Sequence, residues 1–202
     1  FRLFAGNACR NSDDYFPKRP REVQQAHLRQ NACNALFMQN VAWPDWDMFQ
    51  SHGPCATAHA IARAVSGGPV YVCDSPGQQD GALLRRLVCS DGSVPAFARP
   101  AQVLADRILV DVAVEDRLLM LHNQSGPRRV LAAFHCRQEG ETAVEASWRI
   151  ADLPGCARGR WACWDHLAGT LRVISAGARQ RLRLDPGEGA VITVAPVLRG
   201  CA

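Results

Sequence analysis

The first half of the chain alternates short apolar runs with segments of helical periodicity. Three segments have apolar or small residues at helical spacing: residues 22–39, 56–65 and 80–88. Three runs beside them read as strands: residues 1–9, 40–43 and 67–74. In the first helix, Leu28, Ala32 and Ala35 lie on one face. The order strand, helix, strand, helix, strand, helix favours parallel βα units.

The pattern changes at about residue 100, where runs typical of β-strands replace the helical spacing. Residues 107–114 alternate with period two and predict a strand, because Ile108, Val110 and Val112 share a face. Seven more β-type runs follow: residues 117–122, 129–136, 144–150, 159–164, 170–175, 180–184 and 189–195. Turn sequences rich in Gly and Pro separate most of them. The sequence therefore predicts an α/β part followed by an all-β part, an antiparallel β-sandwich.

Composition and charge exclude several classes of protein. The net charge of the 202 residues is only +4, and no basic stripe is interleaved with aromatic residues, so nucleic-acid binding is not expected. No apolar run approaches the roughly 20 residues of a membrane-spanning helix. The nine cysteines include no CxxC pair, and Cys163 and His166 lack a second pair of ligands, so no metal site is expected. Free thiols indicate a reducing compartment, and we expect a cytoplasmic protein.

Aspartates follow all three strand candidates of the first half. They are Asp13 and Asp14, Asp45 and Asp47, and Asp74. Functional residues of parallel α/β folds gather at the carboxyl ends of the strands. A single aspartate there is commonly a helix cap or a turn former, and that interpretation stays open for each of them. Three such ends in succession favour a shared site.

The alternation of side chains separates the two aspartates of the first pair. Arg10 and Asp14 share one face of an extended chain, and Asp13 takes the other. A neighbouring arginine favours an ionised carboxylate. Asp14 would therefore need a second buried carboxylate nearby to act as an acid; otherwise Arg10 reaches past it to a substrate hydroxyl. Paired carboxylates with aromatic platforms, such as Trp43 or Trp46, are typical of glycoside chemistry.

Several longer motifs, in order, resemble one family. They are "RNSDDYFP", "WPDWDMFQS", "ARAVSGGPVYVCDSPG", "LLRRLVCSDGSVPAFARP" and "HNQSGPRRVLAAFHC". The chain resembles the raffinose synthase and alkaline α-galactosidase (seed imbibition protein) group of glycoside hydrolase family thirty-six. The similarity is dense from about residue 7 to residue 100 and looser beyond. Several motifs in the right order and spacing make this resemblance highly specific.

The resemblance implies a catalytic (β/α)₈ TIM barrel followed by a C-terminal β-sandwich. Residues 1–100 would supply the last three βα units of the barrel, and residues 101–202 the sandwich. Because the sequence has no initiator Met, we expect a C-terminal fragment of a longer enzyme. The resemblance also implies a retaining mechanism on α-galactosides, which needs no cofactor and no metal.

Roles for particular residues also come from the resemblance. The family has an acid/base four residues after a sugar-binding arginine, a pattern that Asp14 and Arg10 match. Acidic residues of the next strand line the galactose pocket; Asp47 matches best. The other substrate-binding candidates are Asp45, Trp46, Met48 and, with a weaker match, Asp74. The family nucleophile lies in a Lys-x-Asp motif that this chain lacks, so we expect the isolated chain to be inactive. We also expect it to fold poorly, because three barrel strands alone expose a sheet edge and half a core.

Four functions remain open at this point. The first is an α-galactosidase that releases galactose from raffinose, stachyose or related sugars, with water as acceptor. The second is raffinose synthase, a galactosyltransferase that transfers galactose from galactinol to sucrose. The short segment from Pro17 to His27 favours the hydrolase, because plant raffinose synthases carry a longer one. The third is a non-catalytic remnant or carbohydrate-binding module, and the fourth an unrelated α/β domain.

Overall fold

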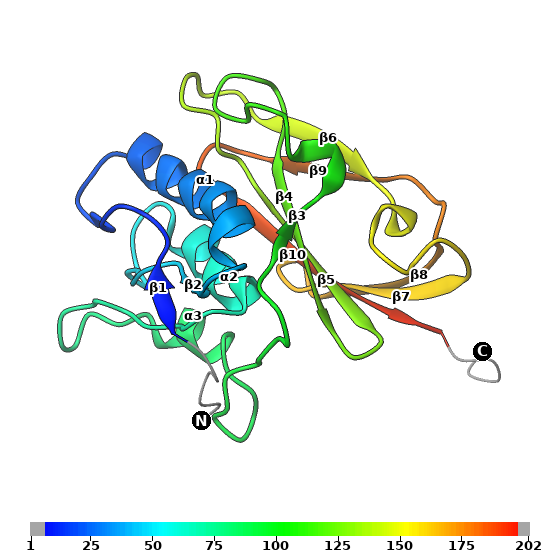
Figure 1. Ribbon diagram of the computed structural model, residues 1–202, viewed down its shortest axis with the longest axis horizontal. Coiled ribbons are helices and arrows are strands. Elements are labelled where there is room, and N and C mark those ends of the chain that lie inside the picture. Colours follow the sequence, from blue (N-terminus) through cyan, green and yellow to red (C-terminus); the bar gives the residue numbers. More distant parts are fainter. Residues whose placement is uncertain (1–6, 198–202) are drawn as a thin grey trace.

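The computed structural model describes residues 7–197. Before residue 100 it contains β1 (Ala8–Arg10), α1 (Arg21–Met38), β2 (Trp43–Asp45), α2 (Ala56–Ser66) and α3 (Gly81–Arg85) (Figure 1). The helices expected over 22–39 and 56–65 are confirmed, whereas the third is shorter than expected. β1 and β2 pair in parallel, with Arg10 opposite Asp45. The third expected strand is reduced to one parallel bridge between Phe49 and Val72. Most of the run expected over residues 1–9 lies outside the described residues.

The rest of the chain is dominated by antiparallel strands. Its strands are β3 (Gln102–Val103), β4 (Leu119–Ser125), β5 (Arg128–Phe134), β6 (Val144–Trp148), β7 (Arg160–Asp165), β8 (Thr170–Ser175), β9 (Gln180–Leu184) and β10 (Gly189–Pro196). Short 3₁₀ turns lie at η1 (Ala105–Arg107) and η2 (Ile150–Asp152). A six-stranded antiparallel sheet has the order β3-β4-β5-β10-β7-β8, and β6 pairs with β9 in a separate sheet. All seven β-type runs expected after residue 115 are confirmed.

The strand expected over residues 107–114 is wrong. This segment consists of η1 and turns, and the side chain of Leu109 is 97% exposed. Asp111 forms the turn, because its Oδ1 accepts a hydrogen bond from the backbone N of Ala113 and its carbonyl accepts one from Val114. Such a local side-chain contact gives the backbone an alternative to a strand. The alternating valines therefore do not mark one face of a sheet.

Both faces of the six-stranded sheet are covered. Successive residues of β4 and β5 alternate between two cores, as side chains of a strand must. Leu121 and Phe134 belong to the core shared with α1 and α2, whereas Met120 and Ala133 belong to the core shared with β6 and β9. In Figure 1 the two helices lie on one side of this sheet and β6 and β9 above it. Residues from before and after position 100 thus contribute to one core.

Two glycines set the distance between elements around α2. Gly67 ends α2 in a left-handed conformation, with φ of 82°. A Cβ atom on Gly68 would lie 2.3 Å from the carbonyl oxygen of Pro44 in β2, too close for any other residue. The "SGGP" sequence, at the start of the strand expected over residues 67–74, ends α2 and lets the backbone after it approach β2.

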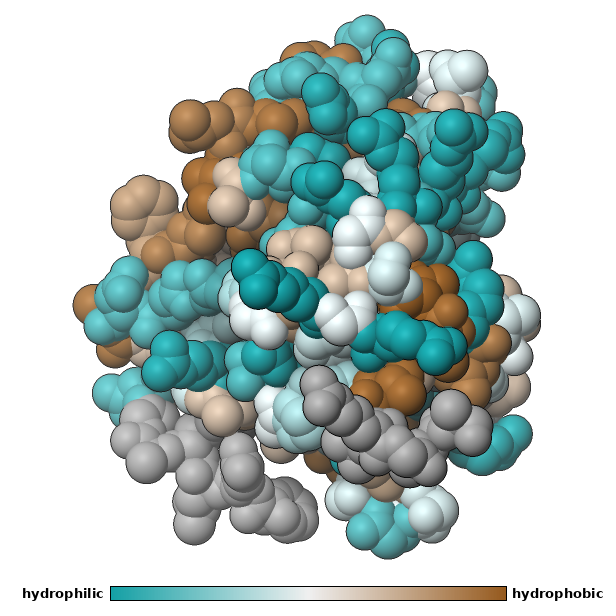
Figure 2. All heavy atoms as spheres, turned by 90° about the vertical axis from the view of Figure 1, so that its right-hand side faces the viewer, coloured by the Kyte–Doolittle hydropathy of each residue, from teal (hydrophilic) through white to brown (hydrophobic). Residues whose placement is uncertain are grey.

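The end of the molecule that carries β7 and β8 lies opposite α1 and β1, and it faces the viewer in Figure 2. Hydrophobic side chains form separate patches there among hydrophilic ones. β8 is an edge strand of the six-stranded sheet, and its Leu171 and Val173 are exposed. Among residues 7–197, no helix combines the length and the apolar character that crossing a bilayer requires.

Candidate functional site

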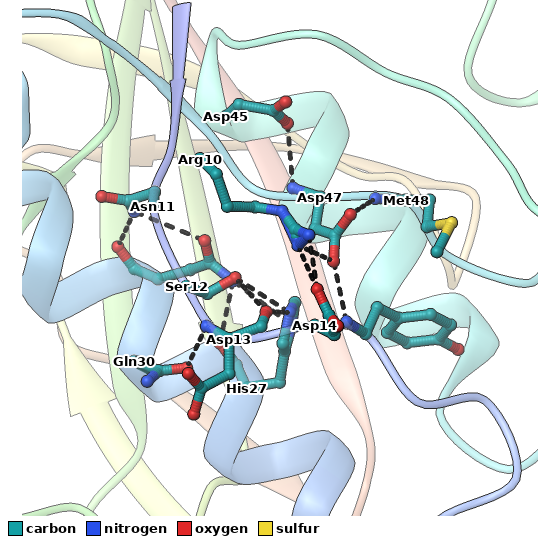
Figure 3. Close-up of polar contacts among 12 residues, drawn as sticks. Arg10, Asn11, Ser12, Asp13, Asp14, His27, Gln30, Asp45, Asp47 and Met48 are labelled. Atoms are coloured by element: carbon teal, nitrogen blue, oxygen red, sulfur yellow. Dashed lines mark hydrogen bonds and ion pairs between the residues drawn. The ribbon is translucent and has the colours of Figure 1, made fainter.

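Arg10, the last residue of β1, joins two carboxylates. Its Nη1 donates to Oδ1 of Asp14 and to Oδ2 of Asp47, both at 2.9 Å, and its Nη2 donates to the same oxygen of Asp14 at 2.6 Å (Figure 3). The two aspartates lie on the chain segments that follow two neighbouring parallel strands. The parallel pairing of β1 with β2 therefore brings together residues 37 positions apart.

Asp47 is buried and has an unusual backbone conformation. Its φ is 65°, and it is the only non-glycine residue with positive φ between residues 7 and 197. Its Oδ2 accepts a hydrogen bond from the backbone N of Tyr15 at 2.7 Å, and its Oδ1 accepts one from the backbone N of Met48 at 2.8 Å. Strained non-glycine residues cluster at functional sites. The carboxylate of Asp47 thus links both strand ends and Arg10.

Asp14 and Asp13 point in different directions, as the alternation predicts. The side chain of Asp14 is 64% exposed and pairs with Arg10. Asp13 is also exposed, and its carboxylate has no hydrogen-bonding partner among residues 7–197. The alternation does not extend to Ser12, because β1 has ended and the hydroxyl of Ser12 turns to His27 in α1 at 3.0 Å.

Helix α1 holds the segment that carries the two aspartates. The amide oxygen of Gln30 accepts a hydrogen bond from the backbone N of Asp13, and Nδ2 of Asn11 donates to the carbonyl of Asn31 at 2.6 Å. Nε2 of His27 contacts the Ser12 hydroxyl and the Asp13 carbonyl. Burial, together with the nearby positive charge of Arg63, lowers the pKa of His27 to about 4, so this imidazole is neutral near pH 7.

Asp45 and Met48 flank the buried Asp47. Both carboxylate oxygens of Asp45 accept hydrogen bonds from the phenol of Tyr71, at 3.0 and 3.1 Å, and Oδ1 also accepts one from the backbone N of Asp47. Burial and this hydrogen bond raise the pKa of Tyr71. Met48 is half-buried beside the cluster. The structure thus brings together five of the seven expected residues: Arg10, Asp14, Asp45, Asp47 and Met48.

The other two expected residues lie elsewhere. Trp46 is 1% exposed and packs in the core beneath α1 and α2, so the expectation of a substrate-binding platform does not hold for it. The large apolar ring of Trp46 packs against the core instead of facing the cluster around Arg10. The fully buried side chain of Asp74 accepts a hydrogen bond from the backbone N of Ser51 and lies 3.4 Å from Nε2 of His52. No ion pair or hydrogen bond joins it to Arg10 within the described chain.

Sequence reasoning missed the group beneath the site, which is Arg63 in α2. Its guanidinium is fully buried and donates to the carbonyls of Asp47 and Met48. Burial lowers the pKa of Arg63 to about 10, which leaves it charged near neutral pH. Tyr15 and Phe49 present their rings to this cation at 5.8 and 5.9 Å. The available signal was a charged residue inside the apolar, alanine-rich run "ATAHAIARAVS".

The charged cluster opens to solvent on one side. A shallow depression of about 450 Å³ is lined by Arg10, Ser12, Asp13, Asp14 and Phe16. Arg10 has donors beyond the three bonds described, since a guanidinium carries five N–H groups. The arrangement can therefore bind a hydroxylated ligand through Arg10 and present Asp14 to it. Among the described residues, no group of three or more His, Cys, Asp or Glu side chains is placed to hold a metal ion.

Comparison with known proteins gives this geometry a family. Residues 4–154 match the family model described as "Raffinose synthase or seed imbibition protein Sip1". The chain belongs to this family. The match covers every residue of the cluster around Arg10, and the resemblance inferred from the motifs is confirmed.

Curated relatives carry the names of galactosyltransferases. The chain is 34% identical over 210 residues to a "Probable galactinol–sucrose galactosyltransferase 1" of Arabidopsis thaliana, with 93% of this chain and 28% of the relative covered. It is 35% identical over 195 residues to a "Galactinol–sucrose galactosyltransferase" of Oryza sativa subsp. japonica, with 87% and 25% covered. The chain thus spans about a quarter of the length of these relatives.

Solved structures share the fold at low sequence identity. A β-L-arabinopyranosidase from Geobacillus stearothermophilus in complex with arabinose superposes with a TM-score of 0.69 at 17% identity, over 95% of this chain and 46% of that one. α-Galactosidase I from Mortierella vinacea gives a TM-score of 0.62 at 13% identity, over 94% and 53%. The mixed α/β fold with a six-stranded antiparallel sheet is therefore the fold of part of these glycosidase structures.

Proposed function

We propose that this chain supplies the acid/base half of the active site of a galactinol–sucrose galactosyltransferase. The observation that carries the proposal is the bridge from Arg10 to Asp14 and Asp47, in a chain of the raffinose synthase family. The names of the relatives support transfer to sucrose over hydrolysis, although the short segment from Pro17 to His27 favours an α-galactosidase. α-Galactosyl oligosaccharides are the substrates in either case.

In the proposed mechanism Asp14 acts twice. In the first step a carboxylate nucleophile attacks the anomeric carbon, the bond to the leaving oxygen breaks, and that oxygen takes the proton of Asp14. In the second step Asp14 removes the proton from a hydroxyl of the acceptor sucrose, whose oxygen attacks the anomeric carbon and releases the nucleophile. The galactosyl group is retained in its α configuration after two inversions.

Arg10 and the neighbouring aspartates bind galactose in this proposal. The partly exposed guanidinium of Arg10 has N–H donors to offer to sugar hydroxyls while Asp47 and Asp14 hold it in place. Asp45 and Met48, which flank Asp47 in the sequence, are proposed to line the galactose pocket of the full-length protein. Asp74 is buried and stabilises the loop after β2, because its Oδ1 accepts a hydrogen bond from the backbone N of Ser51.

The nucleophile is proposed to come from a part of the full-length protein beyond this sequence. The single lysine here, Lys18, is followed by Arg19 and Pro20, so the sequence contains no Lys-x-Asp motif. A retaining site needs its two carboxyl groups roughly 5–5.5 Å apart, so this chain alone should be inactive. We further propose that residues 1–100 belong to a (β/α)₈ barrel and residues 101–202 to a C-terminal β-sandwich.

Product analysis tests the proposed function. The full-length protein is incubated with galactinol, with and without sucrose, and the sugars formed are separated and identified. We expect raffinose in the presence of sucrose and little free galactose. Galactose release that sucrose does not divert would instead identify the α-galactosidase, whose support is the short segment from Pro17 to His27. No conversion of galactinol in either mixture would contradict the galactosyltransferase. If galactose is not released from raffinose either, the α-galactosidase is also contradicted and a non-catalytic carbohydrate-binding protein is favoured.

A cytoplasmic location is also proposed. Its support is the set of eight unpaired cysteines between residues 7 and 197, which fits a reducing compartment. A fluorescent fusion of the full-length protein checks it, and accumulation in the secretory pathway would contradict it.

A further inference from the structure

Arg63, the buried cation beneath the site, takes no direct part in the proposed mechanism. Arg63 is completely buried in α2, and an isolated buried charge is costly unless hydrogen bonds compensate it. Its nitrogens form no ion pair with a carboxylate among residues 7–197. The hydrogen bonds that Arg63 donates must therefore compensate the cost of burying its charge.

The donors of Arg63 hold one turn of the backbone. Nε donates to the carbonyl oxygen of Asp47 at 3.1 Å, and Nη2 donates to that of Met48 at 3.0 Å. Nη1 lies 2.6 Å from Nδ1 of His59, one helical turn earlier in α2. Burial and the charge of Arg63 lower the pKa of His59, so its neutral ring accepts this bond. The planar fork of the guanidinium thus satisfies two successive carbonyls and is itself fixed by His59.

The turn that Arg63 holds is the strained one. Asp47 has φ of 65°, a conformation that is unfavourable for a residue with a side chain and persists only where the surroundings enforce it. This backbone conformation directs the Asp47 carboxylate to Arg10 and to the backbone N of Tyr15. A relaxed turn would carry that carboxylate away from both donors.

We propose that Arg63 is a positioning residue for the acid/base site. It fixes the left-handed turn at Asp47, the Asp47 carboxylate fixes Arg10, and Arg10 holds Asp14. The inference rests on the proposed function for its catalytic consequence, but its structural part can be tested separately. Lysine cannot replace Arg63, because one ammonium group does not present the forked donors that reach both carbonyls and His59.

The kinetic test compares two substrates in the full-length enzyme. Activated nitrophenyl α-galactoside needs little protonation of its leaving group, whereas an unactivated galactoside needs the acid. The substrate ratio is defined as kcat/KM for the unactivated galactoside divided by kcat/KM for the nitrophenyl α-galactoside. It does not depend on how much of a preparation is folded. We expect this ratio to fall about tenfold in Arg63→Met and in Arg63→Lys. Arg107→Met is the matched control, since Arg107 is also a buried arginine but its guanidinium, within residues 7–197, bonds only to Asp106.

A double variant tests the route of the effect. If Arg63 acts through Asp47, Arg63→Lys adds little to the loss in Asp47→Asn, whereas independent effects multiply. An unchanged substrate ratio in Arg63→Lys, or multiplying losses, overturns the proposal. Should Arg63→Met not fold, the lysine variant, which keeps the charge, still decides.

Crystal structures separate this inference from the proposed function. We expect Arg63→Lys to lose the positive φ at Asp47 and the Arg10–Asp47 pair. That result in an enzyme whose wild type converts no α-galactoside would refute the proposed function and keep the positioning role. An unchanged turn would refute the positioning role, whatever the activity of the wild type.

Discussion

The Nη1 atom of Arg10 lies 2.9 Å from Oδ2 of Asp47, and this contact couples a half-exposed cation to a buried carboxylate. The two residues lie on neighbouring parallel strand ends and are separated by 37 positions. Asp14 shares the same guanidinium from the solvent side. The carboxylate pair expected from the sequence therefore exists, with an arginine between its members. One aspartate of the pair is available to a ligand, and the other is committed to the protein.

Asp14→Asn in the full-length enzyme should lower turnover of unactivated galactosides by roughly a hundredfold or more. Nitrophenyl α-galactoside should suffer much less in the first step, because its leaving group needs little protonation. Asp13→Asn is the matched control and should be milder, since Asp13 points away from Arg10. Steady-state kinetics on both substrates checks this. Equal, small losses on both substrates would refute the acid/base role of Asp14.

Asp47→Ala should destabilise the full-length protein by about 3 kcal/mol. The substitution leaves the buried backbone N of Tyr15 and one bond of Arg10 without an acceptor, and alanine tolerates positive φ poorly. Asp47→Asn should cost about half as much, because asparagine still accepts a hydrogen bond and adopts this conformation more readily. The midpoints of thermal unfolding should fall in that order, and the reverse order would mean that the contacts of Asp47 do not stabilise the fold.

His27 should make stability depend on pH. Its folded pKa of about 4 lies below the unfolded value of 6.5, so the unfolded state binds the proton first as the pH falls. This contribution is fully present above pH 6.5 and is lost towards pH 4, by on the order of 3 kcal/mol. Urea unfolding between pH 7 and pH 4.5 measures the loss. His27→Gln should reduce the slope without abolishing it, because burial also lowers the pKa of the neighbouring His59. A slope equal to that of the wild type would contradict the contribution of His27.

Gly68→Ala should displace β2 and reduce activity. Its new Cβ would lie 2.3 Å from the carbonyl oxygen of Pro44, the residue before Asp45, so the backbone must move. A loss of about 1–3 kcal/mol in stability is expected from such overpacking. Gly177→Ala is the control, because nothing lies within 4 Å of its Cβ position. The thermal unfolding midpoint and the rate of galactosyl transfer should fall below those of the wild type in Gly68→Ala and stay unchanged in Gly177→Ala.

The spacing of apolar residues was sufficient to predict most of the helices and strands. α1, α2 and seven β-runs follow from this spacing; α1 buries one face, and β6 and β9 alternate in burial. Residues 107–114 failed, since a single aspartate at 111 forms a turn that overrides the alternating valines. Arg10 and Asp14 were paired correctly by the alternation of side chains, although β1 ends at Arg10.

The rest of the site depends on contacts between distant segments. Trp46 was expected at the ligand, but a residue in a turn can face either way, and the core of α1 and α2 takes this ring. Arg63 could be recognised as an unusual charge in an apolar helix, whereas its contact with the turn at Asp47 follows only from the placement of α2. The pattern of apolar and polar residues does not predict the positive φ of Asp47.

The core shared across residue 100 limits how this family can be recombined. Helix α2 packs on the same sheet face as Phe134, and a Cβ atom at Gly189 of β10 would lie 3.2 Å from Cα of Ala58. Chimeras that join the helices of one relative to the strands of another would therefore mismatch this interface. Exchanging α1 and α2 together with β4, β5 and β10 keeps the matched surfaces in one piece, and such a unit is the sensible one to transplant between relatives.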